Sequence, residues 1–210
     1  DAITAVGGFD DDTLTEDFDL TVKILKLGSP TRAVESICLT EAPETLRDLY
    51  RQRLRWDRGH VQTLLKHRDV FRTPRYGFLY AIVFPILLLS LTVVPIVGMV
   101  ILASIVIELL VGSPVRVLSF ALIFTLGQLL VSVLAVRLQG GDPKLALYAP
   151  LFVIGYRQFL DVVMLKSVFD VLFKEDLRWT RAARTGTLHT ALEDEVDEDA
   201  DSVPEIRIEP

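Results

Sequence analysis

Two acidic residues in a short polar stretch could take part in acid–base chemistry. The stretch TEDFDL, residues 15–20, places Glu16 and Asp17 where apolar residues begin to recur at helical spacing. A carboxylate at the mouth of a site can take a proton from a hydroxyl nucleophile. Acids in the first turn of a helix can equally complement the helix dipole and do nothing more. The stretch alone leaves both interpretations open.

A second motif further along the chain could bind a phosphorylated sugar. It reads QRLRW, and its Gln52, Arg55 and Trp56 are spaced i, i+3 and i+4, which places them on one helix face. Arg offers a planar fork of donors to phosphate oxygens, Trp offers a flat apolar face to a sugar or a base, and Gln can donate and accept. The same residues would suit an interfacial helix whose arginines contact lipid phosphates. Arg58 falls outside the motif, so we expect Arg58→Lys to be tolerated.

The elements that would position these residues are two helices and a strand. Residues 13–28 carry apolar residues at helical spacing and end on Gly28, a common helix stop. A second helix is predicted from Pro43 to about His67. Between the two, residues 32–40 alternate as a strand would. The sequence therefore predicts helix, strand and helix before its apolar part.

Apolar residues dominate from Phe78 to Phe173, in stretches long enough to cross a bilayer. At about 1.5 Å per residue, a helix over residues 78–111 would be about 50 Å long, whereas the hydrocarbon core is about 30 Å thick. Either one helix exceeds the bilayer or the chain folds back near Pro95 and Gly98. We favour the second possibility, a tight hairpin.

Further spans are predicted at residues 117–136 and 147–173, although charges interrupt the latter. Arg157 and Asp161 are four residues apart there, and we expect them to pair. Basic residues lie on both sides of the apolar region, and basic flanks prefer the cytoplasm. If both ends of the apolar region lie in the cytoplasm, the chain crosses the membrane an even number of times, so we predict four crossings. The alternative is three, with part of residues 147–173 in the membrane interface.

Four regions are predicted along the chain. Residues 1–77 form the C-terminal part of a cytoplasmic domain with an interfacial helix, and residues 78–173 form the membrane region. Residues 174–190 form a basic cytoplasmic segment, and residues 191–210 form an acidic, disordered tail that dominates the net charge of −6. The first residues resemble neither a signal peptide nor an initiator, which suggests a piece of a longer protein.

Three consecutive acids, Asp10, Asp11 and Asp12, precede the TEDFDL stretch. Carboxylates in a row could bind a metal ion, but we expect a solvated turn here. The three histidines of the chain show no metal-ligand spacing. We therefore assign no metal ligand within this chain.

The order of the motifs resembles that of a known enzyme family. The stretches GGFDDDTLTEDFDL, EAPETL and QRLRW, followed by apolar segments, resemble membrane-embedded family 2 glycosyltransferases of the cellulose, hyaluronan and poly-N-acetylglucosamine synthase type. The later KEDLRWTRAARTG, with Trp179, Arg184 and Gly186, resembles the stretch that ends many of them. The resemblance implies an α/β fragment, the C-terminal part of a GT-A-type catalytic domain, followed by an α-helical transmembrane region.

The resemblance also implies roles for the motif residues. Asp17 would be the general base on the acceptor hydroxyl, with Glu16 as its supporting acid. Gln52, Arg55 and Trp56 would hold the nucleotide diphosphate and the acceptor end. The family transfers sugar from a nucleotide-sugar donor with inversion and needs a divalent cation, Mg or Mn. We expect that cation to be bound mainly by an N-terminal half that this chain lacks.

The implied partners are a nucleotide-sugar donor, a glycan or glycolipid acceptor and membrane lipids, with no nucleic acid. The implied location is the plasma membrane, multi-pass, with the catalytic part and the C-terminus in the cytoplasm. Two alternatives to a polysaccharide synthase stay open. One is a non-processive transferase that adds a single sugar to a lipid, and the other is a non-catalytic membrane anchor.

Overall fold

The computed structural model describes residues 2–29, 31–32, 34 and 42–173. The chain divides into two compact units, Asp1–Thr31 with Arg53–Trp179, and Arg32–Gln52 with Thr180–Pro210. Apart from Arg32 and Val34, the predicted strand lies outside the described residues. So do the predicted basic segment and acidic tail.

Helices are the only regular elements among the described residues, and the predicted α/β fold is therefore wrong. The sequence offered a single candidate strand, and a lone strand has no partner for its backbone hydrogen bonds. The helices on either side of that segment instead bury their apolar faces directly against each other and against the next helices along the chain. The helical character predicted for the apolar region is observed.

The N-terminal part contains α1 (Ala2–Ala5), α2 (Glu16–Lys26) and α3 (Leu46–Lys66), so both predicted helices are present. Gly28 follows α2 with a φ of 79°, a left-handed conformation that glycine adopts without strain. Thr45 precedes α3, and its hydroxyl accepts from the Asp48 backbone N–H at 3.1 Å, which caps the helix start.

One hydrophobic cluster holds these helices to the elements that follow. Two short 3₁₀ turns, η1 (Arg68–Arg72) and η2 (Pro74–Tyr76), connect α3 to the apolar part. The apolar part begins with a π-helical turn, η3 (Leu79–Val83), and the helix α4 (Phe84–Leu91). The buried members of the cluster come from α2, α3, η1, η3 and α4, and they are Val22, Val61, Leu64, Val70, Leu79, Phe84 and Leu91. The beginning of the predicted membrane run is therefore part of a protein core.

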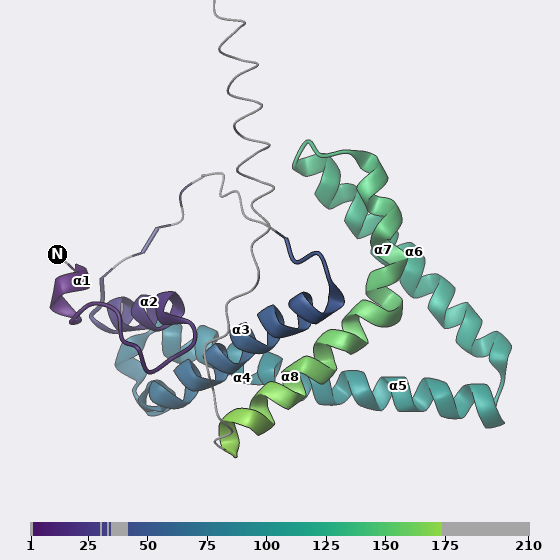
Figure 1. Cartoon of the computed structure of the whole chain (residues 1–210). Coiled ribbons are helices and arrows are strands. Elements are labelled where there is room, and N and C mark those ends of the chain that lie inside the picture. The colour runs from purple at the N-terminus through teal and green to yellow at the C-terminus, as the bar shows by residue number, and fades with distance from the viewer. Residues whose placement is uncertain (1, 30, 33, 35–41, 174–210) are drawn as a thin grey trace, which may run out of the picture. The chain divides into compact units, whose positions relative to one another are not determined.

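The helical run bends at Thr92 and continues as α5 (Val93–Val111) straight through Pro95 and Gly98. The predicted hairpin at this point is therefore wrong. One side of α4 packs in the core through Phe84 and Leu91, whereas its Ile86, Leu88 and Leu89 are exposed. The 19 residues of α5 would extend about 28 Å, close to one bilayer thickness. The chain reverses instead at Gly112 and Ser113, where Figure 1 shows α6 (Pro114–Leu138) turning away from the end of α5.

Two helical runs in the described part, Leu79–Val111 and Pro114–Leu138, are long and apolar enough to cross a membrane. The predicted span at 147–173 is broken into η4 (Pro143–Tyr148), α7 (Ala149–Leu151), a π-helical turn η5 (Phe152–Tyr156) and α8 (Arg157–Leu172). Gly155 has a φ of 103°, and its backbone N–H donates to the Gln158 side-chain oxygen at 2.7 Å.

Buried carboxylates of α8 join it to other helices of the same unit. The predicted pair is observed, with Arg157 and Asp161 3.1 Å apart. Asp161 packs against Gly98 of α5, where a Cβ would collide with its carboxylate. Near the other end of α8, Asp170 accepts from the Arg58 Nε of α3 at 2.9 Å. The charges inside the last apolar stretch are thus paired within the protein.

Candidate active site

A pocket of about 570 Å³ lies between the start of α2 and the middle of α3. Its lining comes from the residues just before α2, the first turns of α2 and one face of α3, and comprises Leu14, Thr15, Glu16, Asp17, Phe18, Thr21, Arg55, Trp56 and His60. Four of the predicted site residues, two from each motif, therefore meet at one pocket.

The α2 side of the pocket presents two carboxylates to solvent. Glu16 and Asp17 occupy the first turn of α2, and both are exposed. The Asp17 carboxylate accepts from the Phe18 backbone N–H at 2.7 Å, which orients it at the helix start. An exposed, oriented carboxylate can accept a proton from a hydroxyl that enters the pocket.

The α3 side presents a cation and an indole. Arg55 and Trp56 are half-buried at the pocket wall. The guanidinium of Arg53 lies 5.0 Å from the centre of the Trp56 ring, a cation–π contact that restricts the indole. Gln52 lies one helical turn before Arg55, in the second unit, and its role stays a prediction.

His60 is a pocket residue that the motif analysis missed. Its ring meets Phe18 edge-on, with 5.1 Å between the ring centres. Burial lowers the pKa of His60, while the negative charge of Asp17 opposes that shift. A neutral imidazole can both donate and accept hydrogen bonds near the Asp17 carboxylate. The available signal was position, since His60 lies four residues after Trp56 and so on the same helix face.

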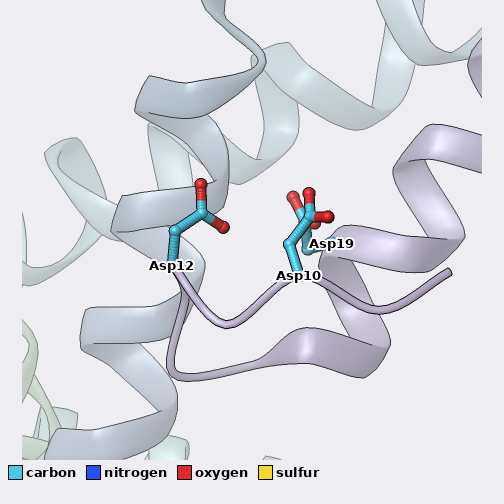
Figure 2. Close-up of side chains that lie close together, drawn as sticks. All are labelled: Asp10, Asp12 and Asp19. Carbon is cyan, nitrogen blue, oxygen red and sulfur yellow. The ribbon is translucent and has the colours of Figure 1, made fainter. Parts of the chain in front are cut away.

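Two acids of the loop before α2, Asp10 and Asp12, form an ion cluster with Asp19 of α2, and of these three Asp19 is the buried one. Figure 2 shows Asp10 and Asp12 of the loop with their carboxylates near Asp19 of α2. The Lys66 ammonium lies 2.6 Å from Asp10, 2.6 Å from Asp12 and 2.9 Å from Asp19. Asp11 and Asp12 are exposed, as expected for a solvated turn, whereas Asp10 is partly buried. The expectation did not include ion pairs of Asp10 and Asp12. Both are ion-paired, and these pairs anchor the loop to the last turn of α3.

Hydrogen bonding and burial shift the pKa of three groups in or next to this cluster, Asp10, Lys66 and His67. Hydrogen bonds from Lys66 and Lys23 lower the pKa of Asp10 to about 2. Burial works against the charged form of Lys66, but hydrogen bonds to three carboxylates raise its pKa overall. His67 binds the far oxygen of Asp19 at 2.8 Å, and burial lowers the pKa of this imidazole.

These three carboxylates do not fit a divalent cation. A metal ion needs the carboxylate oxygens that converge on one point, and Lys66 already takes one oxygen of each. The ammonium supplies the positive charge that would otherwise favour a metal ion there. We derive no catalytic step through a metal at this cluster.

The pocket brings two carboxylates, an arginine and an indole together, in a unit that also contains long apolar helices. The family described as "Glycosyl transferase family group 2" matches residues 1–136. This match covers more than half of the chain, and the chain belongs to that family. It is a transferase family, and the matched residues include the whole pocket.

A relative among known proteins is similar over a shorter stretch. The "Probable glycosyltransferase YdaM" of Bacillus subtilis (strain 168) is 40% identical over 65 residues. That alignment covers 30% of this chain and 16% of the relative, so the chain spans a minor part of that protein's length. No solved structure matches the chain significantly.

Proposed function

We propose that this chain belongs to a membrane enzyme that transfers a sugar from a nucleotide-sugar donor to a growing polysaccharide, with inversion at the anomeric carbon. The observation that supports it is the pocket, which brings Glu16 and Asp17 of α2 to Arg55 and Trp56 of α3. These are the groups that such a transfer needs: a base for the acceptor, a cation for the diphosphate and a surface for a sugar ring.

In the proposed mechanism, an acceptor hydroxyl attacks the anomeric carbon of the donor from the face opposite the leaving group. A new glycosidic C–O bond forms, the bond from carbon to the diphosphate oxygen breaks, and the hydroxyl proton passes to Asp17. Arg55 stabilises the charge on the departing diphosphate by charge-assisted hydrogen bonds. Trp56, held by Arg53, provides the face on which a sugar ring stacks.

A divalent cation, when bound, would neutralise charge on the donor diphosphate. We propose that residues outside this chain hold it, since Lys66 occupies the acidic cluster next to the pocket. The work of this chain's residues is then to bind the acceptor end, remove its proton and retain the leaving diphosphate.

The membrane location rests on α5 and α6. Within the described residues, Pro95 is the single buried residue of α5, and α6 has none. We propose that both helices cross the plasma membrane, with the pocket on the cytoplasmic side and the turn at Gly112–Ser113 outside. In a Cys38→Ser background, an impermeant thiol reagent applied to intact cells should label Ser113→Cys and leave Gln139→Cys unlabelled. The reverse pattern would contradict this orientation.

Product analysis tests the reaction itself. The full-length protein in membranes is supplied with UDP-glucose or UDP-N-acetylglucosamine, each radiolabelled, and the products are separated by size. A ladder of sugar oligomers supports the proposal. A single labelled glycolipid would show a non-processive transferase acting on a lipid acceptor. A protein that gives no product with either donor or with other nucleotide sugars would be an anchor and not an enzyme.

A further inference from the structure

The residues just before α2 touch α3 at two positions that neither motif contains. These residues, Thr13 to Thr15, are buried and lead directly into the carboxylates of the pocket. They contact α3 at Gly59 and Gln62, three and six residues beyond Trp56. The two contacts therefore lie between the acid-bearing turn and the helix that carries the arginine and the indole.

The first contact is steric. A Cβ on Gly59 would lie 2.5 Å from both Cγ2 and Oγ1 of Thr15, closer than real Cβ atoms approach their neighbours. Glycine in a helix interior costs about 1 kcal/mol relative to alanine, so its presence here needs a local reason. Gly127 in α6 provides a contrast, because a Cβ there would meet nothing within 4 Å. Only a residue without a side chain at position 59 lets Thr15 approach α3 this closely.

The second contact is a hydrogen bond. The Leu14 backbone N–H donates to the Gln62 side-chain oxygen at 2.9 Å, across 48 residues of sequence. The hydroxyls of Thr13 and Thr15 are buried and have no hydrogen-bond partner among the described residues. Lys66 binds Asp10 and Asp12 earlier in the loop and Asp19 within α2. For residues 13–15, which lie between these ion pairs, the hydrogen bond to the Gln62 side chain is the polar contact with α3.

We infer that Gly59 and Gln62 are positioning residues, which fix the distance between the Asp17 carboxylate and the Arg55–Trp56 face of α3. Gly59 sets how closely the turn approaches the helix, and Gln62 sets its register along the helix. This role rests on the proposed function, because it concerns the geometry of transfer. The contacts themselves do not depend on it.

Two matched pairs of variants of the full-length protein test this inference, with kcat and the donor KM measured for each. Gly59→Ala should lower kcat on the order of a hundredfold, the loss typical of a misplacement by about 1 Å. Its control, Gly127→Ala, should stay near wild type. Gln62→Leu should lower kcat by about tenfold, since it leaves a buried donor without a partner. Gln62→Glu keeps the acceptor oxygen and should stay near wild type.

The donor KM separates positioning from general damage. It should change by less than about twofold in all four variants, because a displaced carboxylate affects the acceptor step and leaves donor binding intact. Equal kcat values for Gly59→Ala and Gly127→Ala, or for Gln62→Leu and Gln62→Glu, would overturn the inference. So would a kcat loss matched by an equal fall in the amount of folded protein.

Hydrogen exchange at the Leu14 amide provides a readout that needs no activity. The amide should be protected in wild type and in Gln62→Glu and should exchange faster in Gln62→Leu. Fast exchange in wild type would overturn the contact and the inference together. A protein that protects this amide but transfers no sugar would overturn the proposed function and the positioning role, while leaving the contact in place.

Discussion

Two helix pairs of the first unit differ in how their side chains are covered: α2 with the part of α3 from Arg53 to Lys66, and α5 with α6. In the first pair, charged side chains are numerous, and several are ion-paired within the protein, as Lys66 is with three carboxylates. In the second pair, the side chains are apolar and almost none are covered by protein. The first pair therefore needs no external partner for its structure. The second exposes a surface that water does not favour, and a bilayer would cover it.

The burial of apolar side chains decreases along the run on passing Thr92, although Ile86, Leu88 and Leu89 before it are already exposed. Leu79, Phe84 and Leu91 on one side are buried in the cluster that includes α2 and α3. Beyond Thr92 the helix is exposed along nearly its whole length. The apolar run of the sequence thus contains residues buried in the protein core and residues exposed on α5. Both sets are apolar, so composition alone does not distinguish them.

The largest expected effect concerns the polar pair. Asp17→Asn removes the proposed base and should lower turnover by about 10²–10⁴-fold, the usual contribution of general-base catalysis. The donor KM should change little. Asp11→Asn is the matched control, because Asp11 is an exposed acid of the loop before α2 and lies outside the pocket. A variant at position 17 that keeps most of its turnover would remove Asp17 from the mechanism.

The next effect concerns the tie between α3 and α8. Arg58 and Asp170 form an ion pair in which both side chains are largely buried. Arg58→Ala should lower the free energy of unfolding by about 2 kcal/mol, since it removes the charge-assisted hydrogen bonds from α3 to Asp170. Lys166, 2.8 Å from the other oxygen of Asp170, still pairs with that carboxylate, so the loss stays below that of a fully unpaired buried charge. Thermal unfolding in detergent measures this. Arg51→Ala is the control, because Arg51 is exposed and lies 3.8 Å from Asp48. Equal losses for the two variants would contradict the buried pair.

A smaller effect is expected at the pocket arginine. Arg55→Lys keeps the charge but loses the planar fork of donors, and activity should fall by roughly tenfold or more. Arg51→Lys, on an exposed arginine of the same helix, should leave activity unchanged. Equal, mild effects at both positions would favour a lipid-facing anchor over a phosphate site.

The smallest effect depends on pH. Asp57 is buried on α3, and its desolvation raises its pKa to about 6, with the charge of Arg53 opposing the shift. The folded state therefore holds its proton to higher pH than the unfolded state, and the free energy of unfolding falls as pH rises from about 4 to 6. Asp57→Asn should stabilise the protein above pH 7, on the order of 1 kcal/mol. Unfolding at pH 4 and pH 8 measures this, and an equal gain at both would contradict it.

The sequence predicted the parts that depend on local pattern. Both helices of the polar pair follow from apolar spacing and from stop signals such as Gly28. The pairing of Arg157 with Asp161 follows from a spacing of four on one helix. The motif resemblance identified four residues that line the pocket, although their catalytic roles stay predictions.

The parts that the sequence did not predict depend on contacts between distant segments. The ties of Arg58 to Asp170 and of Lys66 to Asp10 join residues 112 and 56 positions apart. From the sequence, Gly59 is only a residue that destabilises a helix. Its contact with Thr15, which a side chain at position 59 would block, is visible only in the structure. The hairpin was misplaced because Pro95 and Gly98 resemble a turn, whereas α5 continues through both. The α/β class was wrong because it was inferred from the family resemblance, whereas the described residues of this chain form helices as their only regular elements.

The central claim is that the carboxylate of α2 and the cation of α3 act together in one transfer site. The double variant Asp17→Asn/Arg55→Lys tests it most directly, with turnover measured against both single variants and wild type. Residues that act as a unit show losses that do not multiply. The double variant should therefore lose little more activity than Asp17→Asn alone. A loss equal to the product of the two single losses would show that the residues act independently, and it would contradict a single site.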